Sequence, residues 1–182
     1  MRDALRPLGA LGRRTLLEIG AGRGANVPYF SEFGFRPERM VLNELCPEKA
    51  ADARRKFPCV RVLVGDAASL DGECYDVVVA ATVFTSIREN GHRRRVAEAM
   101  WRLTKPGGGV LLYDFTWNNP WNPNVRKLTV AEIRRLFPAA RPAVTRVTLA
   151  PPLARHVPLW LYRILRLCPW LRTSVVCWLR KE

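Results

Sequence analysis

The stretch RTLLEIGAGRG, residues 14–24, joins a short apolar run to a cluster of glycines. Apolar runs of this length are typical of buried parallel strands. Glycines at the carboxyl end of such a strand allow a tight turn and let backbone N–H groups approach a ligand. Taken alone, the stretch also fits the relaxed dinucleotide pattern formed by Gly20, Gly22 and Ala25, or a plain turn. The surrounding elements decide among these interpretations.

Further apolar runs follow at 40–44, 60–66, 75–81 and 109–115, with helical patterns between them at 26–33, 47–56 and 91–103. This alternation predicts β-α-β units, whose right-handed crossovers build a parallel sheet with helices on both faces. On the 91–103 helix, Val96, Met100 and Leu103 form a core-facing stripe, and arginines 93–95 fall largely outside it. Residues 105–108, KPGG, are expected to turn the chain before the fifth run.

The pattern changes after residue 115. Residues 116–124 have the composition of a loop rich in Asn, Pro and Trp. A helix over 129–137 is expected to begin with a capping box of Thr129 and Glu132. Beyond it the sequence predicts a strand over 143–149, a helix over 152–167 and a last strand over 174–179. Since nothing repeats, we expect a single domain over residues 1–182.

The charge is large and uneven. The chain of 182 residues has 30 Lys and Arg against 16 Asp and Glu, a net charge of +14. Residues 116–182 hold 12 of these basic side chains and only two acidic ones, Glu132 and Glu182. Arginine suits the bidentate binding of phosphate or carboxylate, although a GC-rich genome gives the same bias. The five cysteines are widely spaced without a C-x-x-C pair, so neither a disulfide framework nor a metal site is expected.

No uninterrupted apolar stretch of signal-peptide length lies within residues 1–12, so we expect a cytoplasmic protein. The 152–167 helix carries apolar residues on one face and arginines elsewhere. It is expected to cover the sheet or, alternatively, to contact anionic lipid at the inner membrane surface.

Two acidic residues end neighbouring predicted strands. Glu44 follows Gly24 by 20 residues, a spacing at which an acid accepts hydrogen bonds from ribose hydroxyls. Asp66 ends the third run, where it is placed to accept from the amine of adenine. Each position is weak alone, but the ordered set of a glycine loop and two strand-end acids predicts a nucleoside-binding edge.

At these positions the sequence resembles the class I S-adenosylmethionine-dependent methyltransferases. The resemblance rests on LLEIGAGRG (16–24), VLNEL (41–45), VGDA (64–67), YDVVVAATVF (75–84) and LTKPGGGVLLYDF (103–115). It implies a Rossmann-like α/β fold with a seven-stranded, mostly parallel sheet and an antiparallel last strand. A hydride-transferring dehydrogenase shares the glycine loop and the ribose acid, but the later motifs fit it poorly.

The resemblance implies S-adenosylmethionine as cofactor and no metal. Its binding residues would be Glu18, Gly20, Ala21, Gly22, Gly24, Glu44, Asp66 and Ala67. Residues 1–115 would then form the cofactor-binding half and residues 116–182 the substrate-specificity half. Family members usually carry one or two helices before the first strand that cover the cofactor, whereas here 14 residues precede Thr15, which predicts either a truncated chain or an unusually open site.

Candidate groups for acceptor chemistry follow the fourth and fifth runs. Asp114, His92 and Glu89 are candidate bases. Their non-catalytic alternatives are a loop contact for Asp114, a helix cap for His92 and a surface charge for Glu89. Trp117, Asn118, Asn119 and Trp121 are candidate substrate-binding residues, because amides and indole rings suit a polar ring such as a sugar. The alternative for the two tryptophans is that they pin the loop onto the core. His156 is expected to be packed or exposed without function.

The sequence therefore predicts a methyltransferase acting on a small or lipid-linked acceptor, with a sugar or an anionic molecule as acceptor classes. The 114–155 region has a loose similarity to bacterial enzymes of cell-surface glycan or lipid biosynthesis. One alternative is a nucleic-acid (RNA) methyltransferase or binder, favoured by the net charge. Another is a non-catalytic domain that keeps the fold as a scaffold for a partner.

Overall fold

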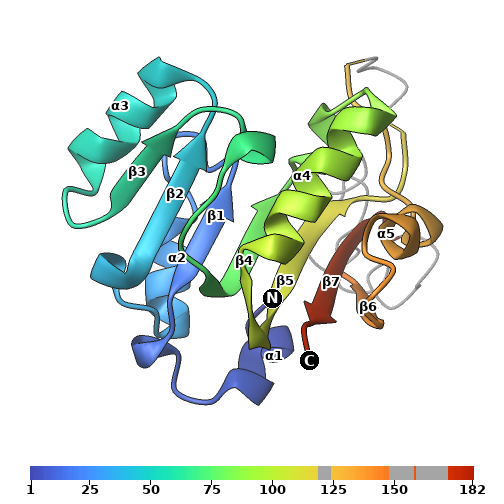
Figure 1. Ribbon diagram of the computed structural model, residues 1–182, viewed down its shortest axis with the longest axis horizontal. Coiled ribbons are helices and arrows are strands. Elements are labelled where there is room, and N and C mark those ends of the chain that lie inside the picture. The colour runs from blue at the N-terminus through green and yellow to red at the C-terminus, as the bar shows by residue number, and fades with distance from the viewer. Residues whose placement is uncertain (119–123, 148–157, 159–171) are drawn as a thin grey trace.

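The apolar runs of the sequence pair side by side in one seven-stranded sheet, ordered β3-β2-β1-β4-β5-β7-β6 (Figure 1). The structure, a computed structural model, describes residues 1–118, 124–147, 158 and 172–182. The strands are β1 (Leu16–Ile19), β2 (Met40–Glu44), β3 (Arg61–Val64), β4 (Tyr75–Ala81), β5 (Thr104–Phe115), β6 (Pro142–Arg146) and β7 (Ser174–Arg180). The α-helices are α1 (Arg2–Leu5), α2 (Val27–Phe33), α3 (Pro47–Lys56), α4 (Asn90–Arg102) and α5 (Val130–Leu136).

The predicted mixed sheet is confirmed. β1 pairs in parallel with both β2 and β4, and β4 pairs in parallel with β5. β7 is antiparallel to β5 and to β6. The strand order reverses between β1 and β4, and ligands of such sheets bind in the crevice outside the carboxyl ends of the strands at this point.

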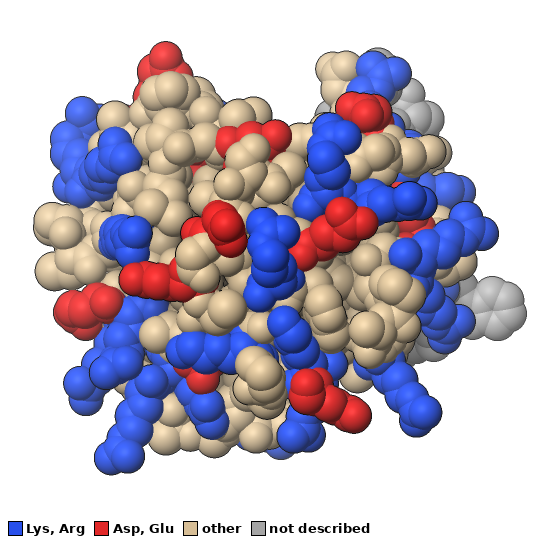
Figure 2. All heavy atoms as spheres, in the orientation of Figure 1, with Lys and Arg blue, Asp and Glu red and all other residues tan. Residues whose placement is uncertain are grey.

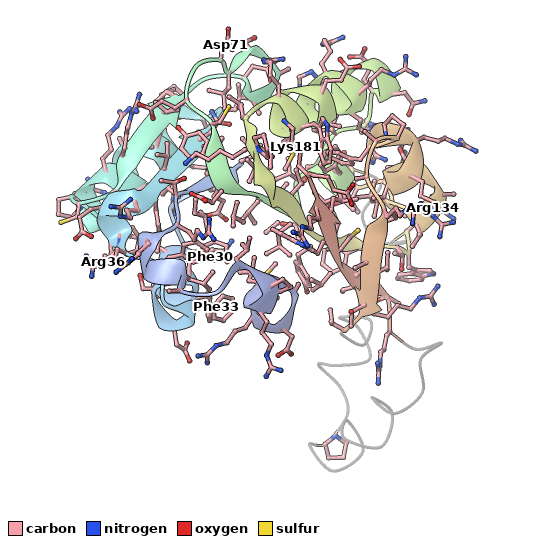
Figure 3. All side chains as sticks on the ribbon, turned by 60° about the horizontal axis from the view of Figure 1, so that its bottom comes forward. Phe30, Phe33, Arg36, Asp71, Arg134 and Lys181 are labelled. Atoms are coloured by element: carbon pink, nitrogen blue, oxygen red, sulfur yellow. The ribbon has the colours of Figure 1, made fainter. Side chains whose placement is uncertain are left out.

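Two apolar layers cover the sheet. α4 and α5 pack on one face, in front of the sheet in Figure 1, and Val96, Met100 and Leu103 are buried there as predicted. α1, α2 and α3 belong to the layer on the opposite face. Within that layer Phe30 and Phe33 of α2 contact each other edge to face (Figure 3). The crossovers on both faces bring all the parallel strand ends to one edge.

β5 is longer than the sequence predicts. Residues 105–108 lie within the strand that starts at Thr104, because the chain after β7 pairs with them: Gly107 N–H donates to the carbonyl of Lys181, and Lys181 N–H donates to Gly108. The Nζ atom of Lys181, labelled in Figure 3, also donates to the carbonyls of Trp101 and Thr104 at 2.7 Å. The end of α4 is thereby tied to the last strand.

Arg93 corrects the helix analysis, because its side chain is fully buried and its spacing of three and seven residues from Val96 and Met100 places it on the same face as the apolar stripe. Its guanidinium donates to the carbonyl of Ile87 at 2.7 Å, to that of Arg126 at 2.9 Å and to the carboxylate of Glu132 at 2.6 Å. A buried arginine is tolerated when its N–H groups find acceptors. A stripe analysis, which counts only apolar residues, misses such a position.

The same network changes the predicted capping box. Thr129 Oγ1 accepts from the N–H of Glu132 as expected, at 3.1 Å. The Glu132 carboxylate, however, receives Arg93 and Arg126 instead of turning back to the helix start. One half of the box is present, and the other half is used to hold α5 against α4.

The N-terminal segment lies away from the parallel strand ends. Leu5 and Leu8 are buried in one layer with Val176 and Trp178 of β7, and Figure 1 shows α1 at the opposite edge of the sheet from the tips of β1 and β2. Among the described residues, no helix is long and apolar enough to cross a membrane. The predicted 152–167 helix, together with Asn119, Trp121 and His156, lies outside the described residues.

Candidate functional site

Glu18 sits at the centre of the parallel strand ends and is almost completely buried in β1. Its Oε1 accepts a hydrogen bond from Asn26 Nδ2 at 2.6 Å, whereas its Oε2 is buried without a partner. Burial raises the pKa of Glu18 to about 7, and the hydrogen bond from Asn26 offsets only part of this shift. An unpaired buried carboxylate oxygen is costly unless a cation or donor reaches it.

The glycine loop after β1 has two kinds of glycine. Gly22 has a φ of 59° and a side chain added there would meet nothing within 4 Å, so this position borders open space. Gly20 and Gly24 are packing positions, where an added Cβ would lie 2.8 Å from Val83 and 2.9 Å from Phe57. Ala21 is buried, and its N–H donates to the carbonyl of Asn43.

Glu44 joins the glycine loop to the end of β2. Its Oε2 accepts from the N–H of Gly22 at 2.8 Å and its Oε1 from the N–H of Cys46 at 3.0 Å. Each carboxylate oxygen keeps further acceptor capacity, since an ionised carboxylate offers about four lone-pair sites. The next residue, Leu45, is 68% exposed and presents an apolar surface beside this acid.

Asp66 follows β3 on the same edge. Its Oδ1 accepts from the N–H of Ala68 at 2.9 Å and so caps the short helix η4 (Ala67–Ser69). Gly65 before it has a φ of 138° and open space around its α-carbon. Ala67 packs against the core beneath this turn. Glu18, Glu44, Asp66 and the open glycines therefore surround one edge, as the motif order predicts.

The three candidate bases lie in different surroundings. Asp114 is buried, and its oxygens accept from the N–H groups of Thr85 and Phe115. Burial raises its pKa, although these hydrogen bonds act in the opposite direction. His92 lies 3.5 Å from Asp66. Glu89 is exposed directly before α4. The contacts of Asp114 are therefore those of its non-catalytic alternative, a side chain that binds the neighbouring loop.

Two of the candidate substrate-binding residues, Trp117 and Asn118, are described and follow β5; we call them the substrate wall. Trp117 is 43% exposed. The side-chain oxygen of Asn118 accepts from the N–H of Lys127 at 2.7 Å, so this amide closes the loop on itself. The N–H of Arg126 donates to the carbonyl of Thr85, which joins the wall to the chain after β4.

Three features of this edge are missing from the sequence analysis. Asn26 looks like a helix cap, but its side chain binds Glu18 instead of capping α2. Thr82 has a φ of 58°, which is strained for a β-branched residue, and the turn that it makes brings Val83 against Gly20. Leu45 is detectable in the sequence only as an apolar residue that follows a strand-end acid.

The comparisons with known proteins agree with this geometry. A family model described as a methyltransferase domain matches residues 17–112, more than half of the chain. The chain belongs to this methyltransferase domain family. It is a class I S-adenosylmethionine-dependent methyltransferase, and S-adenosylmethionine is its methyl donor. No curated protein matches the methyltransferase at the sequence level.

Several solved structures share the fold of this methyltransferase. A putative methyltransferase from Haloferax volcanii, in complex with the Trm112 methyltransferase activator, has a TM-score of 0.72 and 17% identity over 100% of this chain and 88% of that chain. An S-adenosylmethionine-dependent methyltransferase from Mesorhizobium loti has a TM-score of 0.70 and 14% identity over 98% and 96%. CalS10, a SAM-bound amino pentose methyltransferase from Micromonospora echinaspora, has a TM-score of 0.65 and 20% identity over 97% and 88%.

The strand-end residues fit this cofactor. The unpaired Glu18 oxygen suits a cationic ammonium, such as the one on the methionine portion. The space beside Gly22 and Gly65 leaves backbone and ligand free to approach each other. Glu44 and Asp66 place carboxylate oxygens on this edge, and such oxygens can accept hydrogen bonds from hydroxyl and amine groups.

Proposed function

We propose that this methyltransferase transfers a methyl group to a small or lipid-linked acceptor, with a sugar as the favoured class. Residues 1–115 bind the cofactor in this proposal, and residues 116–182 form the acceptor side of a single domain. The observation that carries the cofactor-binding part of this proposal is the buried, unpartnered Glu18 oxygen at the switch point of the sheet.

Each acidic cofactor-binding residue in this proposal binds a different part of the cofactor. Glu18 neutralises the ammonium of the methionine portion, Glu44 accepts from the ribose, and Asp66 accepts from the adenine amine. Gly20, Gly22 and Gly24 give the loop its shape, while Ala21 and Ala67 support it from below. S-adenosylmethionine supplies an electrophilic methyl group on a sulfonium, so the protein contributes chiefly alignment of the acceptor.

The acceptor side is basic and carries an exposed indole. Trp117 is open to solvent after β5, in a position to stack on a sugar ring. Arg88 and Lys127 are exposed on either side of Arg126, which donates to the carbonyl of Arg88. An anionic group on the acceptor, such as the phosphate of a lipid-linked sugar, would be attracted to these side chains. The fold is also that of an amino pentose methyltransferase.

The nucleic-acid alternative has less support. Figure 2 shows basic side chains spread over the visible face and interspersed with acidic ones, instead of gathered in one groove. Arg126 is also paired with Glu132, with 2.5 Å between the two groups, although Glu132 is shared with Arg93. Binding to nucleic acid requires an extended basic surface and falls steeply with salt.

The proposal is tested by methyl transfer from radiolabelled S-adenosylmethionine to a panel of acceptors. The panel contains sugar nucleotides, lipid-linked sugar phosphates, uncharged glycosides and RNA. We expect label in a sugar-containing acceptor. Trp117→Ala should lower kcat/KM for that acceptor about 10-fold, Trp117→Tyr should restore most of it, and neither should change the Kd of S-adenosylhomocysteine. Label in RNA alone would contradict the proposal, and no transfer to any acceptor would favour the scaffold alternative.

A further inference from the structure

His92 and Asp66 come from different elements and meet at the cofactor edge. Asp66 caps η4 after β3, and His92 lies in the first turn of α4, which packs against η4. The Nε2 atom of His92 lies 3.5 Å from Asp66 Oδ1, with the two side chains 27% and 40% exposed. The same Oδ1 accepts the capping hydrogen bond from Ala68 N–H.

The neighbour of His92 fixes which ring nitrogen carries the proton. Nη2 of Arg95, one turn further along α4, lies 3.2 Å from His92 Nδ1. A guanidinium only donates hydrogen bonds, so Nδ1 must be the acceptor. In a neutral ring the proton is then on Nε2, the nitrogen that faces Asp66.

Both groups therefore face one oxygen of Asp66, Ala68 N–H through a hydrogen bond at 2.9 Å and the His92 ring through a longer contact at 3.5 Å. Oδ1 faces Ala68 N–H and His92 Nε2–H, and within the described part of the chain no donor is found for Oδ2. The second torsion of an Asp side chain is broad and poorly defined on its own. The hydrogen bond from Ala68 and the adjacent His92 ring restrict the orientation of the carboxylate and leave Oδ2 as an acceptor.

We propose that His92 is a positioning residue that orients Asp66, so that Oδ2 accepts a hydrogen bond from the 6-amino group of the cofactor adenine. Arg95 supports it by fixing the ring tautomer. This inference rests on the proposed assignment of Asp66 to the adenine. It gives His92 a part in recognising the base of the cofactor and none in deprotonating the acceptor.

The test measures the Kd of two ligands by calorimetry on the full chain. One is S-adenosylhomocysteine, and the other is its 6-desamino analogue, whose purine carries hydrogen in place of the amine. His92→Phe keeps a planar ring without a donor, and His92→Gln keeps an N–H at the place of Nε2. Arg94→Ala is the control, because Arg94 is an exposed neighbour on the same helix.

His92→Phe should weaken binding of S-adenosylhomocysteine about 2- to 10-fold, the size expected for one ordinary hydrogen bond. It should leave binding of the desamino analogue unchanged, and it should have no further effect in an Asp66→Asn background. His92→Gln should restore most of the affinity, and Arg95→Met should lower it by a smaller factor than His92→Phe. Arg94→Ala should match the wild type.

Two failures are distinguishable. If the wild type prefers the adenine ligand to its desamino analogue and His92→Phe and Arg95→Met keep that preference in full, the inference is overturned while the proposed cofactor site stands. An equal loss for both ligands would also overturn it, because it would show a merely structural role. If the wild type binds neither ligand, the proposed function itself fails, and the inference with it.

Discussion

Replacement of Glu18 by Gln should remove a pH-dependent loss of stability from the cofactor-free protein and should weaken cofactor binding. The buried carboxyl has a pKa of about 7, against an ordinary value of 4.5, because burial disfavours its charged form. In the folded chain it holds a proton that the unfolded chain releases. Stability from this group is therefore full below pH 4.5 and is lost as the pH rises towards and through 7.

The magnitude follows from proton linkage. About one in ten Glu18 carboxyls is ionised at pH 6 and about three in four at pH 7.5. The cofactor-free wild type should lose about 1 kcal/mol of unfolding free energy over this interval through Glu18 alone. In the proposed site the ionised form of Glu18 binds the cationic methionine portion, so affinity for S-adenosylhomocysteine should rise by up to roughly eightfold over the same interval.

The assay is urea unfolding at pH 6 and pH 7.5 without cofactor, together with calorimetric titration at both values. Glu18→Gln should remove both pH dependences and bind S-adenosylhomocysteine at least 10-fold more weakly at pH 7.5. Glu32→Gln, which removes an exposed carboxylate from α2, is the matched control and should change neither. Equal pH slopes in wild type and Glu18→Gln, or unimpaired binding by the variant, would refute this account of the site.

Other variants test the packing around the site. Gly24→Ala should lower unfolding free energy by about 1–3 kcal/mol in urea titration, because the added Cβ would lie 2.9 Å from Phe57 at a φ of 74°; a stability equal to wild type would contradict the packing. Arg93→Met should cost about 1–3 kcal/mol, because the carbonyls of Ile87 and Arg126 lose their donor while Glu132 keeps Arg126; a neutral effect in the same assay would show that the network is dispensable. Asp76→Asn should lower thermal stability at pH 7, because hydrogen bonds, chiefly from Thr15, outweigh burial and lower the pKa of Asp76. That difference should shrink as the pH falls below 3.8, and a difference that persists in acid would refute the electrostatic cause.

The parallel half of the fold is predictable because its signals are local. Each strand of this half is an apolar run, and Pro47 at the start of α3 and the buried stripe of α4 mark helices without reference to any contact. The glycine loop is likewise a local pattern. Sequence periodicity therefore places every parallel strand and the edge that carries the site.

The features that the sequence analysis missed depend on contacts between residues that are distant in the chain. Arg93 is buried because acceptors arrive from segments distant in the chain, Ile87, Arg126 and Glu132. The strand character of residues 105–108 depends on the backbone of Lys181. None of these partners can be inferred from residue spacing along a single helix or strand. The pKa of Glu18 also depends on burial by the assembled sheet, which a strand pattern does not measure.

The most direct test of the central claim is calorimetric titration of the full chain with S-adenosylhomocysteine at pH 7.5. The account predicts saturable binding at one site, weakened at least 10-fold in Glu44→Gln, because Glu44 is the acid shared by the glycine loop and the ribose position. Absence of binding by the wild type at high protein concentration, or equal affinity of wild type and Glu44→Gln, would contradict it.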